Sequence, residues 1–222
     1  MKAMILAAGR GERMRPLTDH TPKPLLHIGK HRLIEHHIIN LAHAGFKDIV
    51  INIAWLGKLI RETLGDGSNY GVTIFYSDEG DSALETGGGI FKALPLLGDD
   101  PFLVVNGDIW TDYPFQTLYN HKLRGSAHLI LVNNPPQHPN GDFYLANGKL
   151  IESGEQKFTF SGIGVYKKEF FAGRTGGAFP LAPMIREFTK QGLVSAELYQ
   201  GEWDDIGTIE RLNARIKKQV PR

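Results

Sequence analysis

The sequence contains no cysteine, and this absence removes several kinds of chemistry at once. Disulfide bonds, thiolate nucleophiles, zinc sites with sulfur ligands and iron–sulfur clusters all need cysteine, so none of them is available. A chain without cysteine suits a reducing compartment, and we expect a cytoplasmic location.

Long apolar runs and an excess of charge of one sign are missing too. No run approaches the roughly 18 apolar residues that a membrane-spanning helix needs, and the apolar run 3–8 is shorter than a secretory signal. The 25 Lys and Arg against 24 Asp and Glu leave a net charge of +1. We therefore expect neither a nucleic acid nor a membrane as partner, and any bound phosphate must be held by a local cluster of donors.

The composition that remains is that of a folded domain. Hydrophobic residues make up 41% of the 222 residues and charged residues 22%, which favours one domain with its own core. Glycine is in excess, with 26 of 222 residues, about 12% against a usual value of about 7%. Much of this glycine is gathered in a few loops.

Predicted strands and helices alternate through the first part of the chain. Short apolar runs bounded by glycine or proline predict strands, and apolar residues at helical spacing predict helices. In chain order these segments are 2–8, 33–44, 48–54, 56–64, 72–77, 88–97, 102–108, 115–123 and 127–132. Because the strands are apolar throughout, we expect a Rossmann-like, doubly wound α/β fold with a mostly parallel sheet.

The pattern changes after Pro135-Pro136. Asn147-Gly148 is a type I′ turn signal and predicts a hairpin over 142–153, followed by a return strand over 158–166. A helix over 181–191, a strand over 194–199 and a helix over 209–218 complete the prediction. The sheet is therefore expected to be mixed, within a single domain that spans residues 1–222.

A glycine loop follows the first predicted strand, with the sequence Leu-Ala-Ala-Gly-Arg-Gly-Glu-Arg-Met-Arg-Pro-Leu-Thr over 6–18. Gly9 and Gly11 let the backbone approach a polyphosphate, and successive N–H groups can form an anion-binding nest. A dinucleotide fingerprint would need glycine in place of Met14, and a Walker loop would need a closing Gly-Lys-Ser/Thr. The loop instead supplies guanidinium groups, which bind phosphate with paired hydrogen bonds: Arg10, Arg13 and Arg15.

Lys23 stands between Pro22 and Pro24. Proline fixes its own φ and restricts the residue before it, so this lysine projects from a stiff backbone. Such rigidity indicates a lysine with a positional role.

The glycine loop followed by Pro22-Lys23-Pro24-Leu25 resembles the signature of the sugar-1-phosphate nucleotidylyltransferases. The resemblance implies a GT-A-like fold and an enzyme that joins a nucleoside triphosphate to a sugar 1-phosphate. It further implies that Ala8, Gly9 and Gly11 cradle the triphosphate, that Arg13 contacts phosphate, and that Lys23 reaches the sugar phosphate or the α-phosphate. The nucleotide would then bind in the part about 1–134 and the sugar in the part about 135–222.

Two aspartates are candidate ligands for Mg²⁺, which prefers oxygen ligands and needs only one or two carboxylates when phosphate is present. Asp108 ends an apolar strand, where open α/β sheets bind ligands, and the resemblance implies that it binds the metal together with Asp205. Asp204 is the alternative ligand by a shift of one position, and Asp205 could instead cap the helix that follows. Asp112 could pair with Asp108, although the spacing is wrong for the acidic motif of related glycosyltransferases.

The remaining site residues are implied by the resemblance alone. Glu85, Thr86 and Gly87 occupy the segment that reads the base, here in a form that departs from the commoner Leu-Gly-Thr-Ala-Gly. Asn106, next to Asp108, is expected to contact the nucleotide. The sugar contacts are expected to be Gly141, Asp142, Glu155 and Gly162.

Within the family, the loop 1–18, the segment 85–89 and the segment 158–164 are similar to the short uridylyltransferases that act on N-acetylmuramic acid 1-phosphate. This similarity implies UTP as donor, Mg²⁺ as cofactor and a role in cell-wall sugar recycling. Alternatives are a mannose-1-phosphate guanylyltransferase, a glucose-1-phosphate thymidylyltransferase, or a nucleotide-sensing module without catalysis. At 222 residues we expect the catalytic domain alone, as a monomer or weak homo-oligomer.

Overall fold

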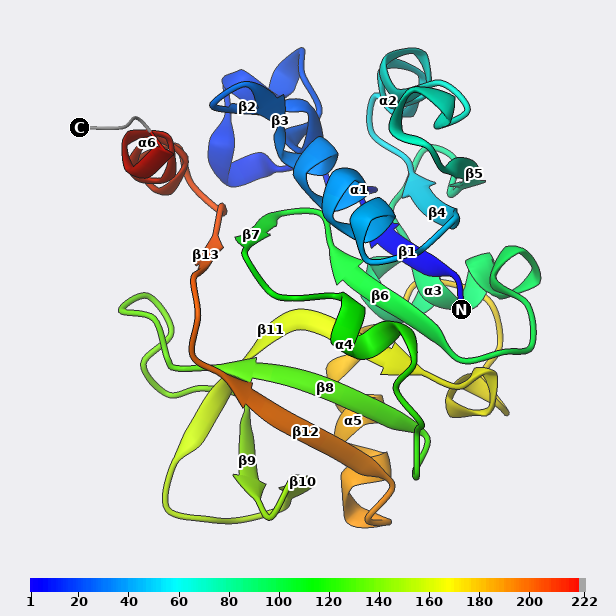
Figure 1. Ribbon diagram of the computed structural model, residues 1–222, viewed down its shortest axis with the longest axis vertical. Coiled ribbons are helices and arrows are strands. Elements are labelled where there is room, and N and C mark those ends of the chain that lie inside the picture. The colour runs from blue at the N-terminus through cyan, green and yellow to red at the C-terminus, as the bar shows by residue number, and fades with distance from the viewer. Residues whose placement is uncertain (220–222) are drawn as a thin grey trace.

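The computed structural model describes residues 1–219, and its centre is a nine-stranded mixed sheet in the order β5-β4-β1-β6-β11-β8-β12-β10-β9 (Figure 1). The strands of this sheet, in chain order, are β1 (Ala3–Leu6), β4 (Asp48–Ile53), β5 (Thr73–Asp78), β6 (Phe102–Asn106), β8 (Ala127–Val132), β9 (Phe143–Ala146), β10 (Lys149–Ile151), β11 (Lys157–Tyr166) and β12 (Val194–Tyr199). No helix among the described residues is long and apolar enough to cross a membrane.

The first half of the sheet is parallel, as the alternating pattern predicts. Strands β5, β4, β1 and β6 all run in one direction, and the register places Met4 beside Val50 and Val104. Successive side chains point to opposite faces, so Met4 belongs to the core on one face and Ile5 to the core on the other, both fully buried. Because these four strands are parallel, their carboxyl ends meet at one edge of the sheet.

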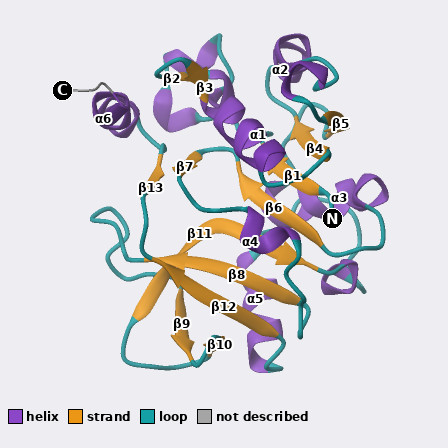
Figure 2. Cartoon of the chain, viewed as in Figure 1, coloured by secondary structure: helices purple, strands orange, loops and turns teal. Residues whose placement is uncertain are grey.

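Helices cover both faces (Figure 2). The core that contains Ile5 is closed by α1 (Leu33–His43), α2 (Gly57–Leu64) and the short α4 (Gln116–Tyr119). The core that contains Met4 is closed by α3 (Glu85–Leu97) and α5 (Ala182–Lys190). The expected doubly wound architecture is thus confirmed.

Antiparallel pairing enters with the second half of the chain. The long strand β11 lies between β6 and β8 and is antiparallel to both, with a register shift between Phe160 and Ile163. The Asn147-Gly148 turn has positive φ at both residues, 49° and 72°, and joins β9 to β10 as the sequence predicts. Because β11 pairs with β6, residues from the second half reach the edge where the parallel strands end.

Two small sheets outside the nine-stranded sheet form a further layer that the sequence did not predict. Two short antiparallel pairs lie beside α6 (Ile209–Gln219). One joins β2 (His27–Ile28) to β3 (His31–Arg32), and the other joins β7 (Ile109–Thr111) to the distant β13 (Trp203–Asp205). Met14, Leu33 and Leu212 belong to the third apolar core, which lies in this layer. Strands of two or three residues are too short for hydrophobic periodicity to reveal them.

Two predicted helices have different bounds in the structure. The helix expected over 115–123 is only the four residues of α4, and α3 begins at Glu85, three residues before the predicted start at Gly88. Gly87 and Gly88 lie in the first turn of α3, and their N–H groups, which have no partner within the helix, donate to the carbonyl of Phe179 at 2.9 and 3.1 Å. A side chain at either glycine would collide with the 177–179 segment, so the glycines allow this close packing.

Candidate active site

A cavity of about 440 Å³ opens at the carboxyl ends of β1, β4 and β6, the position where open α/β sheets bind ligands. Most of the predicted nucleotide residues line it. Those residues are Ala8, Gly9, Gly11, Arg13, Glu85, Thr86, Asn106 and Asp108. Gly87 does not line the cavity, whereas Lys23, predicted at the sugar phosphate or the α-phosphate, does. The glycine loop, the proposed base segment and the first aspartate therefore share one cavity.

The two loop glycines have different roles. A Cβ at Gly9 would meet no atom within 4 Å, so this position leaves open space at the cavity wall. Gly11 has φ of +70°, and a Cβ there would lie 3.0 Å from the Thr18 side chain and 3.2 Å from Cβ of Lys23. Gly11 thus lets the loop pack directly against Lys23.

Only one of the three loop arginines faces the cavity. Arg10 stacks on the Trp55 ring at 3.6 Å and donates to Asp19 at 2.9 Å, and Arg15 donates to the same carboxylate oxygen. The hydrogen bond from Arg10, with help from Arg15, lowers the pKa of Asp19. Arg10 and Arg15 therefore brace the loop, and Arg13 is the arginine that can meet phosphate.

Lys23 and Asp108 form an ion pair inside the cavity, with Nζ and Oδ2 2.7 Å apart. The lysine side chain is 9% exposed and the aspartate 41%, so the carboxylate remains open to a ligand. The two prolines hold Lys23 in a 3₁₀ turn over 23–25, in agreement with the rigidity expected from the sequence.

A second cavity, of about 280 Å³, meets the first. Arg13, Asn106 and Asp108 line both cavities. The second cavity continues between the connection after β8 and strand β11, and Asp205 also lines it. Two ligands, one in each cavity, would thus meet beside Asp108.

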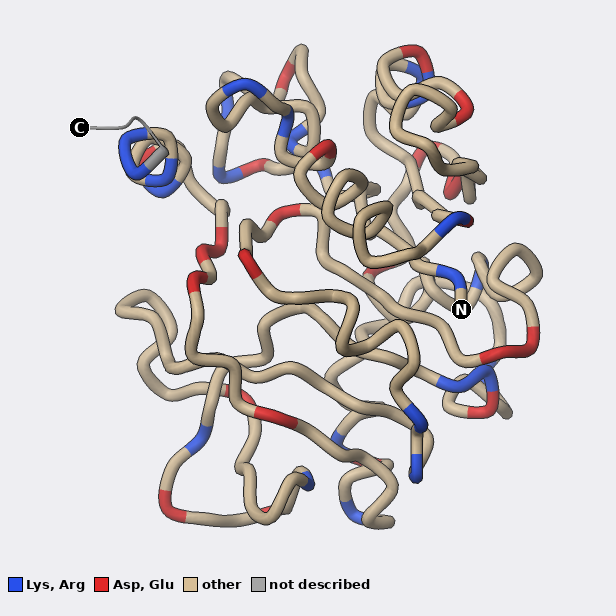
Figure 3. The backbone as a smooth tube through the Cα atoms, viewed as in Figure 1, with Lys and Arg blue, Asp and Glu red and all other residues tan. Residues whose placement is uncertain are grey.

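Asp204 and Asp205 are directed to different places. Asp204 accepts from Arg215 at 3.2 Å and from Lys218 at 3.1 Å, both on α6, and it lines neither cavity. Figure 3 shows this acidic stretch beside the basic helix α6. Asp205 lines the second cavity and accepts from Arg211 at 2.7 Å. The alternative in which Asp204 faces the cavities therefore has no support from its contacts.

Asp108 and Asp205 are the predicted metal ligands, and both line the second cavity. Residues 1–219 contain no group of three or more His, Asp or Glu side chains that could hold an ion. Two carboxylates beside a phosphate site suit Mg²⁺, which usually completes its six oxygen ligands with phosphate and water. The donor set therefore fits a cation that binds together with its substrate.

Sequence reasoning missed three parts of the cavity wall: Asn52, Glu79 and Gly207. The Asn52 side chain makes two hydrogen bonds: its oxygen accepts from the Ala7 N–H at 2.8 Å, and its amide donates to Glu79 at 2.6 Å. The other oxygen of Glu79 accepts from the Leu84 N–H at 2.6 Å. Asn52 and Glu79 lie at the carboxyl ends of β4 and β5, so the strand-end rule that selected Asp108 could have found them.

None of the four predicted sugar residues of the second half lines the second cavity, and Asp142 lines a separate pocket with Tyr144 and Lys157. The Asp142 carboxylate accepts from His138 and from the Phe160 N–H, and Glu155 is exposed. Gly141 and Gly162 have positive φ, and a Cβ at Gly162 would collide with Asn106. These four assignments stay predictions.

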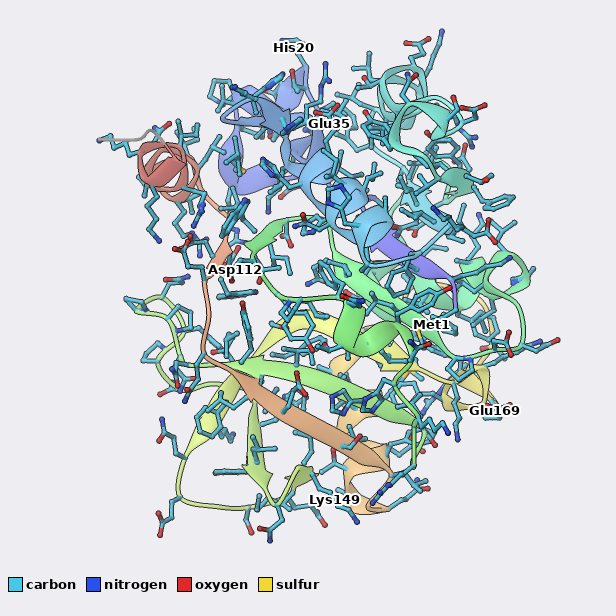
Figure 4. All side chains as sticks on the ribbon, viewed as in Figure 1. Met1, His20, Glu35, Asp112, Lys149 and Glu169 are labelled. Carbon is cyan, nitrogen blue, oxygen red and sulfur yellow. The ribbon has the colours of Figure 1, made fainter. Side chains whose placement is uncertain are left out.

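Asp112 is not brought to Asp108. Its carboxylate accepts from the Tyr199 hydroxyl at 2.5 Å and from the Glu202 N–H at 2.8 Å. Figure 4 shows Asp112 beside strand β13. It therefore ties β12 and β13 to the end of β7.

Comparison with known proteins agrees with this geometry. Residues 2–219 match the family described as nucleotidyl transferase. The chain is 53% identical to an N-acetylmuramate alpha-1-phosphate uridylyltransferase of Neisseria meningitidis, over 96% of this chain and 95% of the relative. It is 33% identical to the protein of that name from Caulobacter vibrioides, over 92% of this chain and 91% of the relative.

A solved structure shares the fold at low identity. The inositol-1-phosphate CTP transferase of T. maritima superposes with a TM-score of 0.80 at 17% identity, over 100% of this chain and 98% of that one. The match along nearly the whole sequence, together with a glycine loop, lysine and aspartate in one cavity, shows that the chain belongs to the nucleotidyl transferase family.

Proposed function

We propose that the protein transfers the uridylyl group of UTP to N-acetylmuramic acid 1-phosphate, with release of pyrophosphate. The observation that carries this proposal is the junction of the two cavities, where Arg13, Asn106 and Asp108 line both. A nucleotide in the 440 Å³ cavity and a sugar phosphate in the 280 Å³ cavity would bring their phosphates together at this junction. Such an arrangement favours group transfer between two bound molecules.

The reaction needs no nucleophile from the protein. An oxygen of the sugar 1-phosphate attacks the α-phosphorus of the nucleotide, a new phosphorus–oxygen bond forms, and the bond to pyrophosphate breaks. Arg13 and Lys23 would offset the negative charge that gathers during this exchange. Gly9 leaves room for the polyphosphate at the loop, and Gly11 keeps Lys23 close to it.

Asp108 and Asp205 would hold Mg²⁺, which supplies positive charge and orients the phosphates when bound. With the negative charge of Asp108 neutralised by the cation, Lys23 would be free to donate to a phosphate oxygen. The ion pair seen in the structure keeps the buried ammonium partnered before substrate arrives.

The choice of substrates rests on the relatives. The two relatives named for N-acetylmuramate 1-phosphate match over more than nine tenths of the chain. Mannose-1-phosphate guanyltransferases also match, for example at 32% identity in Saccharomyces cerevisiae, where the chain covers 67% of the relative. We accordingly propose UTP and the muramic acid derivative, a role in recycling cell-wall sugars, and a cytoplasmic protein that is monomeric or weakly associated.

A pyrophosphate-release assay that crosses UTP, GTP, dTTP and CTP with a panel of sugar 1-phosphates tests the proposal. The panel contains N-acetylmuramic acid, N-acetylglucosamine, glucose and mannose 1-phosphates. We expect the highest kcat/KM for UTP with the muramic acid derivative. A higher value for GTP with mannose 1-phosphate would replace the proposal, and UTP binding without release for any pair would favour a nucleotide sensor.

A further inference from the structure

Two segments line the part of the 280 Å³ cavity that is not shared with the 440 Å³ cavity, together with Ile109 on β7 and with Trp203 and Asp205 on β13. Gln137 and His138 come from the connection between β8 and β9, and Thr159 and Phe160 come from β11. Among the described residues that line this unshared part, only His138 has a side chain that can carry a positive charge. The other cation of this cavity, Arg13, lies at the shared junction.

His138 is held in place by Asp142. Its Nε2–H donates to Oδ1 of Asp142 at 3.0 Å, and Oδ2 of the same carboxylate accepts from the Phe160 N–H at 2.8 Å. The histidine side chain is 43% exposed, so a ligand can reach it. An imidazolium donates from both ring nitrogens, and Nδ1 is therefore available to an anionic group while Nε2 stays on Asp142.

The loop that carries His138 is itself fixed. The Asn134 side chain donates to the carbonyls of Pro139 and Lys157, at 3.1 and 2.9 Å, and accepts from Thr159 at 2.9 Å. Gly141 turns the loop with φ of +58°, at a place where a Cβ would collide with Asn134 and with the Lys157 backbone. His138 is thus presented from a pre-organised loop, as a specific contact requires.

The proposed substrate carries two anionic groups, the phosphate on C1 and the carboxylate of its lactyl group. A carboxylate near the junction would lie beside the phosphates of both proposed substrates, and these like charges would repel it. The nearest alternative cation in the sequence of β11, Lys157, lines a separate pocket and lies 5.2 Å from the Tyr144 ring centre. His138 is the one described side chain in the unshared part of the cavity that can pair with this carboxylate as a positively charged donor.

We infer that His138 binds the lactyl carboxylate and selects an acidic sugar 1-phosphate over a neutral one, with Asp142 as its positioning residue. This inference rests on the proposed function. Asp142 would act through His138 and not touch the sugar itself, because its two oxygens accept hydrogen bonds from His138 and from the Phe160 N–H. The contact with His138 would not strengthen the binding of a sugar 1-phosphate that has no carboxylate.

The test compares two sugar phosphates that differ by the lactyl group. The variant His138→Gln keeps a donor for Asp142 but cannot carry a positive charge. Its kcat/KM is measured with UTP and N-acetylmuramic acid 1-phosphate. The inhibition constant of N-acetylglucosamine 1-phosphate, as a competitor of that substrate, reports neutral-sugar binding. We expect kcat/KM to fall about 10- to 100-fold, through KM, while the inhibition constant changes less than about threefold.

Two further variants complete the design. His138→Arg retains a cation and should keep part of the preference for the acidic sugar, and His43→Gln, an exposed histidine on α1, should match the wild type. Equal weakening of both sugar phosphates in His138→Gln, or no weakening of either, would overturn the inference while wild-type activity leaves the proposed function intact. A wild-type enzyme that prefers a neutral sugar 1-phosphate would overturn both.

Discussion

Nζ of Lys23 lies 2.7 Å from Oδ2 of Asp108, and the two residues reach this contact from segments 85 positions apart. The pair lies at the wall of the 440 Å³ cavity, and Asp108 also lines the 280 Å³ cavity. A lysine held between two prolines thus meets a carboxylate at the end of a parallel strand. The contact joins the two sequence motifs that most strongly indicated nucleotidyl transfer.

Replacing Lys23 by alanine should weaken use of the sugar phosphate more than binding of the nucleotide. The variant removes a cation beside the reacting phosphates, and we expect kcat/KM for the sugar phosphate to fall on the order of 100-fold. Binding of UTP, measured by titration calorimetry, should change less than about tenfold. Lys30→Ala, an exposed lysine outside both cavities, is the control and should behave as wild type.

Arg13 and Arg15 should differ sharply although they are two positions apart. Arg13 lines both cavities, whereas the Arg15 side chain is 60% exposed and donates to Asp19. Arg13→Ala should lower kcat/KM about 100-fold, and Arg15→Ala should lower it less than about threefold, because exposed ion pairs contribute little. Steady-state kinetics of the two variants decide this, and similar losses would contradict the assignment of Arg13 to phosphate.

The two neighbouring aspartates of β13 offer a matched pair. Asp205→Asn should raise the Mg²⁺ concentration for half-maximal activity at least about tenfold, because a carboxylate ligand becomes a neutral amide. Asp204→Asn should leave that concentration unchanged but lower the free energy of unfolding by about 1 kcal/mol, since Arg215 and Lys218 lose a charged partner. Mn²⁺ binding followed by electron paramagnetic resonance gives a readout besides activity. The reverse pattern would make Asp204 the ligand.

The sequence was most informative where local rules act. Strand and helix periodicity, the Asn147-Gly148 turn and the glycine loop each depend on a few adjacent residues, and the structure has all three. The different tasks of Arg10 and Arg13 could not be predicted, because they depend on Trp55 and Asp19 in the folded chain. The contacts of the Asp142 carboxylate could not be predicted either, because one of its donors is the Phe160 N–H on the distant strand β11.

Glu79 shows how a fold-dependent contact can dictate residue type. Both of its oxygens accept hydrogen bonds, from Asn52 and from the Leu84 N–H. Glu79→Gln would place an amide NH₂ against one of these donors, so we expect a loss of about 1–3 kcal/mol in unfolding free energy and weaker UTP binding. Urea unfolding and calorimetry measure the two effects. Glu152→Gln, an exposed carboxylate, should change neither, and a fully stable Glu79→Gln would contradict the proposed network.

His37 should make stability depend on pH. It is buried in α1, its Nε2–H donates to the Ile109 carbonyl at 2.8 Å, and burial lowers its pKa from 6.5 to about 4. Between these two values the unfolded chain binds a proton that the native protein does not, so stability is complete above about pH 6.5 and falls as the pH drops toward 4. From pH 7 to pH 5 this one group should cost roughly 2 kcal/mol.

The variant His37→Gln isolates this contribution, because glutamine can still donate to the Ile109 carbonyl but does not titrate. Urea unfolding at pH 7 and pH 5 should show a stability loss that is smaller in the variant than in the wild type by roughly 2 kcal/mol. The carboxylates that also titrate in this range are common to both proteins and cancel in the comparison. His43→Gln, at an exposed position of α1, should keep the wild-type difference. If His37→Gln loses as much stability as the wild type, the buried histidine is already protonated in the native protein at pH 5.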